Sequence, residues 1–129
     1  MKNLFWILLA CYGLYYYASK HFEFDDTLKY AKTNKQSTMS APIDYYVGMV
    51  YYQRTEYAKA RDAFNQLLED HPTDQRVPRA LVMLDDSAEY LHDWDTAKVS
   101  LQRYVDEYPS GKDIELVKKR LELVKYSHP

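Results

Sequence analysis

The chain has 129 residues, a formal net charge of −2 and a hydrophobic fraction of 47%, which is room for one small domain. This apolar fraction argues against disorder, the single cysteine excludes a disulfide scaffold, and the lack of a basic excess argues against nucleic-acid binding. With three glycines in the whole chain, a turn-rich β fold is disfavoured, so we expect an all-α protein.

Aromatic side chains gather at the amino terminus, where residues 1–24 hold eight of them and carry a net charge of +1. Residues 4–18 have no charged side chain and would form a helix roughly 22 Å long. That is short for a bilayer core of about 30 Å, but interfacial tyrosines and the flanking Lys2 and Lys20 extend the usable span. We therefore predict an uncleaved membrane-anchor helix within residues 1–24. Its lipid-facing side chains would be Leu4, Phe5, Trp6, Ile7, Leu8, Leu9, Tyr12, Leu14, Tyr15, Tyr16 and Tyr17.

Three other interpretations of this segment stay open. Leu8-Leu9-Ala10-Cys11 resembles a lipobox, which would place a lipid on Cys11, although the apolar run before the cysteine is short and the residues after it stay apolar. Ala10 and Ala18 are weak cleavage positions for a secretory peptide, and the segment could also be a buried helix of a globular protein.

The orientation of such an anchor is not settled by charge. Counting lysine and arginine around the helix would put the carboxyl-terminal domain in the cytoplasm. The Met-Lys start followed directly by an apolar run looks instead like a signal-anchor, which exports the part of the chain on its carboxyl-terminal side.

Residues 25–40 read as a polar linker with a possible short helix at 25–31. Beyond Pro42, prolines and helical periodicity predict helices at 43–54, 57–70, 78–91 and 94–107. A fifth helix is predicted from about residue 113 to 126. The loops between these helices are short, so neighbours should pack as antiparallel hairpins.

Two hairpins share one pattern of residue types. Val47, Gly48, Tyr51, Ala60, Phe64 and Pro72 in the first correspond to Leu84, Asp85, Ala88, Ala97, Leu101 and Pro109 in the second, and the two prolines lie 37 residues apart. Small residues at this spacing let the helices approach closely. The pattern resembles the tetratricopeptide repeat, with repeats at 41–74 and 78–111 and a capping helix at 113–126. Asp44 fits the template poorly, and Asp85 replaces its small residue.

The finer motifs resemble repeats of the bacterial envelope type, a group that includes the outer-membrane assembly lipoprotein and the Tol–Pal coordinator. They are Tyr45-Tyr46-Val47-Gly48, Glu56-Tyr57-Ala58-Lys59-Ala60 and Val105-Asp106-Glu107-Tyr108-Pro109-Ser110. This resemblance implies a scaffold anchored in the bacterial inner membrane with its repeats facing the periplasm.

The resemblance also implies that the first helix of each repeat lines a concave, partner-binding face. Carried onto this chain, its positions are Pro42, Tyr45, Met49, Tyr52, Gln53, Arg79, Val82, Asp86, Glu89 and Tyr90. The Lys and Asn that form a carboxylate clamp in chaperone-binding relatives are missing at these positions. Alternatively, Tyr45 and Tyr52 pack against the 25–40 segment.

Catalytic and metal patterns are weak. No histidine has another His or Cys at i+3 or i+4, there is no glycine-rich phosphate loop, and the neighbouring carboxylates of Asp85 and Asp86 should point about 100° apart. We expect no enzyme activity, cofactor, metal or small-molecule substrate. Stable solenoids usually need three repeats, so two repeats should borrow packing from residues 22–40 or, as we expect, complete their surface against a partner.

These expectations combine into a membrane-anchored adaptor that binds the lipid bilayer through residues 4–18 and other membrane or envelope proteins through its repeats, as an accessory subunit of a hetero-complex. Two rivals remain. The chain could be a structural subunit held mainly by its aromatic helix, or a lipoprotein acting in outer-membrane assembly or cell-envelope organisation.

Overall fold

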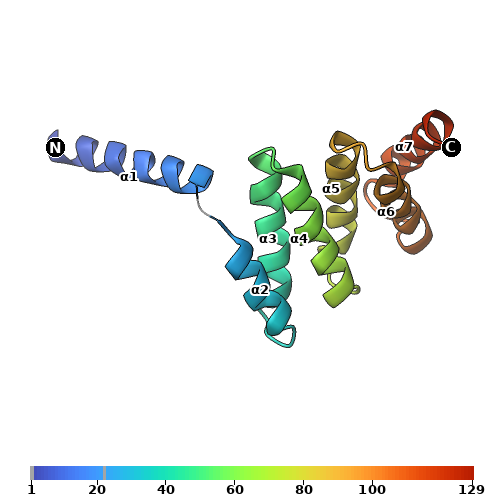
Figure 1. Cartoon of the computed structure of the whole chain (residues 1–129), viewed down its shortest axis with the longest axis horizontal. Coiled ribbons are helices and arrows are strands. Elements are labelled where there is room, and N and C mark those ends of the chain that lie inside the picture. Colours follow the sequence, from blue (N-terminus) through green and yellow to red (C-terminus); the bar gives the residue numbers. More distant parts are fainter. Residues whose placement is uncertain (1, 22) are drawn as a thin grey trace.

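The computed structural model describes residues 2–21 and 23–129, and this part of the chain forms seven α-helices (Figure 1). They are α1 (Lys2–His21), α2 (Asp25–Thr33), α3 (Ser40–Gln53), α4 (Tyr57–Asp70), α5 (Val77–Tyr90), α6 (Trp94–Glu107) and α7 (Ile114–Ser127). The all-α prediction is confirmed. The five helices predicted beyond Pro42 begin and end within three residues of these bounds.

Helices α3 to α7 stack in chain order (Figure 1). α3 packs on α4, α5 on both α4 and α6, and α7 on α6, because each connection is too short for anything but an antiparallel neighbour. One core runs through the stack, and its largest fully buried side chains include Tyr51, Phe64, Leu67, Leu81, Leu101 and Tyr104.

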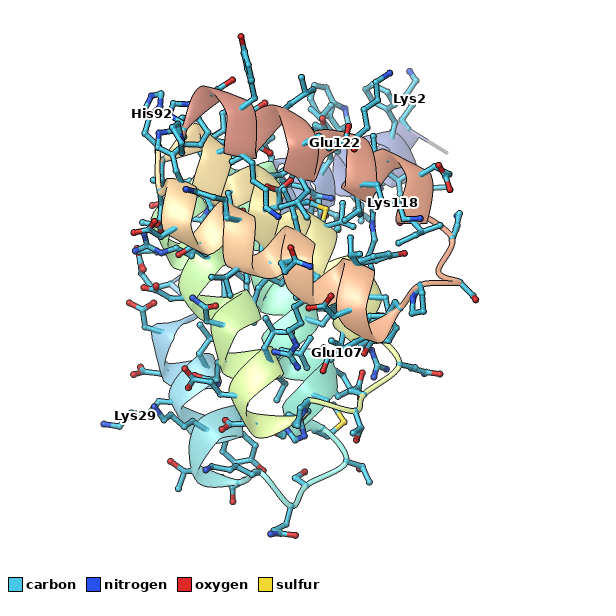
Figure 2. The ribbon with its side chains drawn as sticks, turned by 90° about the vertical axis from the view of Figure 1, so that its right-hand side faces the viewer. Lys2, Lys29, His92, Glu107, Lys118 and Glu122 are labelled. Atoms are coloured by element: carbon cyan, nitrogen blue, oxygen red, sulfur yellow. The ribbon has the colours of Figure 1, made fainter. Side chains whose placement is uncertain are left out.

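The last helix closes the stack at its carboxyl-terminal end. Val117, Leu121 and Val124 of α7 are buried, whereas Lys118 and Glu122 point away from the stack (Figure 2). This spacing of i, i+4 and i+7 gives one apolar stripe against α6 and a charged outer surface, as expected of a capping helix.

The loops of the two hairpins share an unusual backbone conformation. Thr55 follows α3 with φ 61°, and His92 follows α5 with φ 57°. Both residues take the left-handed conformation that stops a helix, which for a non-glycine residue costs of order 1 kcal/mol. The same unusual conformation at equivalent positions makes the hairpins a repeat in structure as well as in sequence.

Gly48 sets the distance between α3 and α4. A Cβ at this position would lie 2.7 Å from Cε1 of Phe64, whose side chain is fully buried. The Phe64 ring therefore fills the place of the missing side chain, and the small residue that the repeat pattern requires is explained by this contact.

The segment predicted as a polar linker with a possible short helix contains α2 and packs against the first hairpin. The backbone N–H of Phe24 donates to the Tyr51 hydroxyl (2.9 Å), which in turn donates to Asp25 (3.1 Å). Ala31 is fully buried, and its carbonyl accepts a hydrogen bond from Ser40 (2.7 Å). The repeats thus borrow packing from residues 24–40, with α2 as a helix on the outside of α3.

Asp44, which fits the repeat pattern poorly, belongs to this junction. Its carboxyl is fully buried and accepts a hydrogen bond from the Gln66 amide (2.6 Å), and the same amide nitrogen donates to the carbonyl of Leu28 in α2 (2.8 Å). Burial raises the pKa of Asp44 to about 7, although the Gln66 hydrogen bond acts in the opposite direction. A polar residue at this core position is therefore explained by the docking of α2.

Helix α1 extends away from the stack (Figure 1). The large apolar side chains between Leu4 and Tyr17 are each at least half exposed. Among the helices that the structure describes, none has both the length and the hydropathy of a bilayer-spanning segment. The predicted single-span anchor is therefore not supported, because the uncharged run is 15 residues long and includes four tyrosines whose hydroxyls lower its hydropathy.

Candidate functional site

The first helices of the hairpins, α3 and α5, lie on one side of the stack together with α7, and we call this side the inner face. A ladder of polar contacts crosses it. The Tyr52 hydroxyl of α3 lies 3.4 Å from Asp86 of α5, and the other carboxylate oxygen of Asp86 accepts from Arg120 of α7 (2.5 Å). Asp86 therefore joins all three helices of the inner face.

Arg120 is the centre of an ion-pair cluster. Its Nη1 lies 3.2 Å from Asp85 and 2.5 Å from Asp86, and its Nε lies 3.8 Å from Glu89. The expectation that the two neighbouring carboxylates could not converge on one atom is thus wrong. Their Cβ atoms diverge around the helix, but the long arginine side chain from α7 reaches between them.

The three acidic side chains of this cluster differ in how deeply they are buried. The Asp85 side chain is completely buried, whereas Asp86 and Glu89 are about a quarter exposed. Burial raises the pKa of Asp85 to about 8, and its hydrogen bond with Glu89 acts in the same direction, against the attraction of Arg120. Burial and the neighbouring Glu89 therefore both favour the protonated form of Asp85.

Three tyrosines form the aromatic part of the inner face. The rings of Tyr57 and Tyr90 stack in parallel, with centroids 4.3 Å apart, and Tyr52 meets Tyr57 edge to face at 5.6 Å. Burial, followed by the nearby Asp86 carboxylate, raises the pKa of Tyr52. Tyr90 remains 61% exposed, so it offers its outer surface to a binding partner.

A pocket opens between these two groups. It has a volume of about 360 Å³ and is lined by Asp86, Glu89, Tyr90, Trp94 and Arg120. The Trp94 ring is held by His128, whose ring stacks on it with centroids 3.7 Å apart. The pocket therefore has acidic and aromatic walls that are fixed by contacts within the chain.

The structure separates the residues predicted for the concave face into three groups. Gln53, Arg79 and Tyr90 are exposed; Pro42, Tyr45, Met49, Tyr52, Asp86 and Glu89 are half-buried; and Val82 is buried. Val82 is 4% exposed and belongs to the core, so its assignment to the surface is corrected. It is buried because α5 packs on both neighbouring hairpin helices, α4 and α6.

The half-buried Tyr45 also has a packing role, since its ring contacts Phe64 and Tyr46 at centroid distances of 6.4 and 5.2 Å. The alternative in which Tyr45 and Tyr52 pack on the 25–40 segment is not what the described contacts show. The tyrosine that packs there is Tyr51.

Sequence reasoning missed Arg120 and His128. Arg120 lies one residue before Leu121 and three after Val117, at the edge of the apolar stripe of α7, and that placement was the available signal for a role in packing. The stacking of His128 on Trp94 had no local signal.

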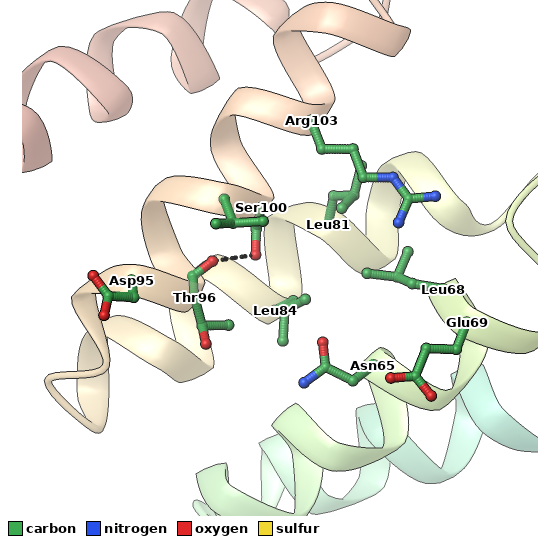
Figure 3. A pocket seen from close by; sticks show the side chains of 10 residues that line it. Asn65, Leu68, Glu69, Leu81, Leu84, Asp95, Thr96, Ser100 and Arg103 are labelled. Atoms are coloured by element: carbon green, nitrogen blue, oxygen red, sulfur yellow. Dashed lines mark hydrogen bonds between the residues drawn. The ribbon is translucent and has the colours of Figure 1, made fainter.

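A second hollow lies on the opposite side, between α4 and α6 (Figure 3). It has a volume of about 320 Å³, with Leu68, Leu81 and Leu84 at its floor and Asn65, Glu69, Asp95 and Arg103 among its polar lining residues. The Ser100 hydroxyl donates to the Thr96 carbonyl (2.6 Å) and is thereby satisfied within α6. Val99, which is 67% exposed, also lines this hollow, so its accessible surface is mostly apolar and lacks the group of carboxylates that marks the inner face.

Comparison with known families identifies the hairpins. Residues 44–74 and 80–111 match the family model described as tetratricopeptide repeat, in agreement with the repeats predicted at 41–74 and 78–111. The two hairpins are tetratricopeptide repeats. Tetratricopeptide repeats are interaction modules and typically non-enzymatic, so this part of the chain implies protein partners. No curated protein matches the chain significantly.

Proposed function

We propose that the chain is a non-enzymatic tetratricopeptide adaptor that is attached to a membrane by α1 and holds a partner protein on its inner face. The observation that carries the proposal is the pairing of two features in one short chain. One is a stack of tetratricopeptide repeats with an open acidic and aromatic pocket. The other is a helix whose large apolar side chains are exposed from Leu4 to Tyr17.

The exposure of α1 argues for a membrane. Leu4, Trp6 and Leu8 are 60–65% exposed, and the tyrosines at 12, 15 and 17 are exposed to a similar or greater extent. A helix that is apolar on all sides is stable where it is surrounded by apolar material, as in a bilayer. The tyrosines suit the membrane–water interface, which accepts an apolar ring with a polar hydroxyl. In this proposal α1 enters the bilayer with its tyrosines near the interface.

The proposed location is the inner membrane of a bacterium, with the repeats in the periplasm. Its support is the resemblance of Tyr45-Tyr46-Val47-Gly48 and Tyr108-Pro109-Ser110 to envelope-type repeats. A small adaptor of this kind would be an accessory subunit of a larger hetero-complex of membrane or envelope proteins.

Cys11 gives a direct test of the membrane attachment, because it is the single cysteine and it is exposed in α1. The full chain is reconstituted into phosphatidylcholine and phosphatidylglycerol vesicles and treated with a charged, water-soluble maleimide. We expect Cys11 to react slowly with vesicles present. The control carries Cys11→Ser and Ser110→Cys and should react quickly, since residue 110 is exposed in the α6–α7 loop. Equal rates for the two thiols would refute insertion.

The inner face is tested by purification of the complex in mild detergent. Alanine at Gln53, Arg79 and Tyr90 together should remove the partner, because these predicted positions are exposed and their loss leaves the core intact. Val99→Ala on α6 is the matched control, since Val99 is 67% exposed on the opposite side. A partner that is retained by the triple variant and lost with Val99→Ala would contradict the assignment.

The large exposed surface of α1 also supports a second function, that of a structural subunit held mainly through this helix. Deleting residues 2–21 distinguishes the two, and the deletion should stop there because the N–H of Phe24 bonds to Tyr51. An adaptor without α1 still binds its partner in solution, whereas a structural subunit held through α1 does not. Intact mass tests the remaining interpretation, because an uncleaved Met1 rules out a lipid on Cys11.

A further inference from the structure

The carboxylates of the inner face leave hydrogen-bonding capacity unused. One oxygen from each of Asp85, Asp86 and Glu89 lies within 4.8 Å of the other two. The guanidinium of Arg120 faces all three. Three carboxylates around one guanidinium give an excess of negative charge that further donors would relieve.

Two buried oxygens at this place have no donor among the described residues. They are Oδ1 of Asp85, whose side chain is completely buried, and Oε2 of Glu89. A single proton held between the two carboxyls would satisfy both oxygens. This agrees with the raised pKa of Asp85, of about 8, to which both burial and Glu89 contribute. A proton shared in this way would lower the negative charge of the cluster.

The walls of the pocket suit a cation. Tyr90 and Trp94 line it beside Glu89, and their rings are stacked on Tyr57 and His128 respectively, so they are held in place. A cation over a Tyr or Trp ring is attracted by the ring quadrupole. Acidic oxygens on one side and aromatic faces on the other are the surroundings in which an ammonium group gains both kinds of contact.

We propose that this pocket binds a lysine side chain of the partner protein, and that Asp85 releases its proton to solvent when the lysine ammonium enters. This inference rests on the proposed function, since the lysine belongs to the protein held on the inner face. The ammonium donates to Glu89 and lies against Tyr90 and Trp94. Its positive charge replaces that of the departing proton, so the net charge of the pocket is unchanged.

A divalent metal fits the same carboxylates less well. Arg120 already lies within hydrogen-bonding distance of Asp85 and Asp86, and a metal would have to displace this guanidinium to use them. An ammonium needs fewer oxygens, and Glu89 together with the aromatic walls supplies them with Arg120 in place.

The exchange of lysine for a proton makes binding depend on pH. Besides Asp86 and Glu89 on α5, the groups that face Asp85 or its pocket are Tyr52 of α3, Arg120 of α7 and, through Trp94, the imidazole of His128. The Asp85→Asn variant separates the contribution of Asp85 to the pH dependence from that of these groups.

The test uses the full chain in detergent micelles and two peptides, acetyl-GGKGG-amide and acetyl-GGQGG-amide. The indole N–H of Trp94 is the reporter in a nitrogen–proton correlation spectrum, assigned by Trp94→Phe. We expect a saturable shift with the lysine peptide and none with the glutamine peptide. Because about one tenth of Asp85 is ionised one pH unit below its pKa, binding should be roughly ten times tighter at pH 9 than at pH 7.

Two variants sharpen the test. Asp85→Asn keeps the shape and stays neutral at every pH, so binding at pH 9 should fall to the wild-type level at pH 7 or below and lose its dependence on pH. Glu89→Gln should weaken binding at both pH values, whereas Glu69→Gln on the opposite side should not. A pH dependence unchanged in Asp85→Asn would overturn the proton release.

Failure of this inference can be told apart from failure of the adaptor. If the lysine peptide leaves Trp94 unshifted while the partner is still lost from the Gln53, Arg79 and Tyr90 variant, the lysine site is wrong and the adaptor stands. If that variant also keeps its partner, the inner face is not the binding surface. A shift caused by magnesium or zinc chloride and not by the peptide would overturn the proposal in favour of a metal site.

Discussion

Replacing Gly48 with alanine is the sharpest probe of the packing between α3 and α4. A methyl group there would lie 2.7 Å from Cε1 and 2.9 Å from both Cδ1 and Cζ of Phe64. Ordinary contact begins near 3.4 Å, so the ring must move by roughly 0.7 Å. Phe64 is fully buried, and its ring also packs against Tyr45, so the ring cannot move without displacing other core side chains.

The magnitude follows from two opposing effects. Overpacking a core by one methyl group costs about 1–3 kcal/mol, whereas alanine in place of glycine inside a helix stabilises it by about 1 kcal/mol. Because the Phe64 ring is fully buried, the overpacking cost should lie in the upper part of this range, about 2–3 kcal/mol, which leaves a net loss of about 1–2 kcal/mol. For a domain of this size each kcal/mol lowers the Tm by about 4–8 °C, so we expect a decrease of roughly 5–15 °C.

The assay is thermal unfolding of the full chain followed by circular dichroism. Gly13→Ala is the control, because a Cβ at Gly13 meets no atom within 4 Å; it should leave the Tm of the repeats unchanged. Phe64→Leu provides a second check. Combined with Gly48→Ala it should cost less than the sum of the single changes, since the smaller side chain relieves the contact. A Tm of Gly48→Ala at or above that of the wild type, or strict additivity, would refute this reasoning.

Three further predictions concern polar groups in the core. Asp44 has a pKa raised from 3.8 to about 7, so the folded chain binds its proton more tightly than the unfolded chain does, and this group makes stability fall as the pH rises from about 4 to 7. Asp44→Asn should remove that dependence and be more stable than the wild type at pH 8 by about 1–3 kcal/mol in urea unfolding; equal pH slopes for both proteins would contradict the cause. Arg120→Met leaves Asp86 and Glu89 without the guanidinium between them and should cost about 1–2 kcal/mol, with faster amide exchange in α7; adding Asp86→Asn should restore part of the loss, and no restoration would argue against the pair. Tyr51→Phe should speed amide exchange across α2, because the N–H of Phe24 loses its acceptor; unchanged exchange would mean that α2 is held by other contacts.

The fold of the repeats was predictable because its signals are local. Pro72 and Pro109 end their helices within the chain itself, and the apolar stripe of Val117, Leu121 and Val124 gives one buried face. The docking of α2 was not predictable, since it depends on the Tyr51 hydroxyl and the Gln66 amide reaching residues more than 25 positions away. Segment 25–40 is polar in composition, and composition does not report such contacts.

The candidate site was predictable in part for the same reason. Position within a repeat indicated Asp86, Glu89 and Tyr90, which line the pocket. It did not indicate Arg120. Most charged side chains on a terminal helix face solvent, and the pairing of Arg120 with α5 depends on how the two helices pack, which the local sequence does not reveal. Val82 was wrongly predicted to lie on the surface, because the pattern of a single repeat does not show that α5 packs against a helix on each side.

The Tyr51 hydroxyl has a mechanical consequence. Three residue steps separate the end of α1 at His21 from Phe24, and a chain of that length spans at most about 10 Å. A force that pulls on α1 is therefore transmitted over this short distance to the Phe24–Tyr51 hydrogen bond. Through Asp25 it also acts on the first turn of α2. In the proposed adaptor, tension between α1 and a partner on the inner face would therefore act first on this hydrogen bond.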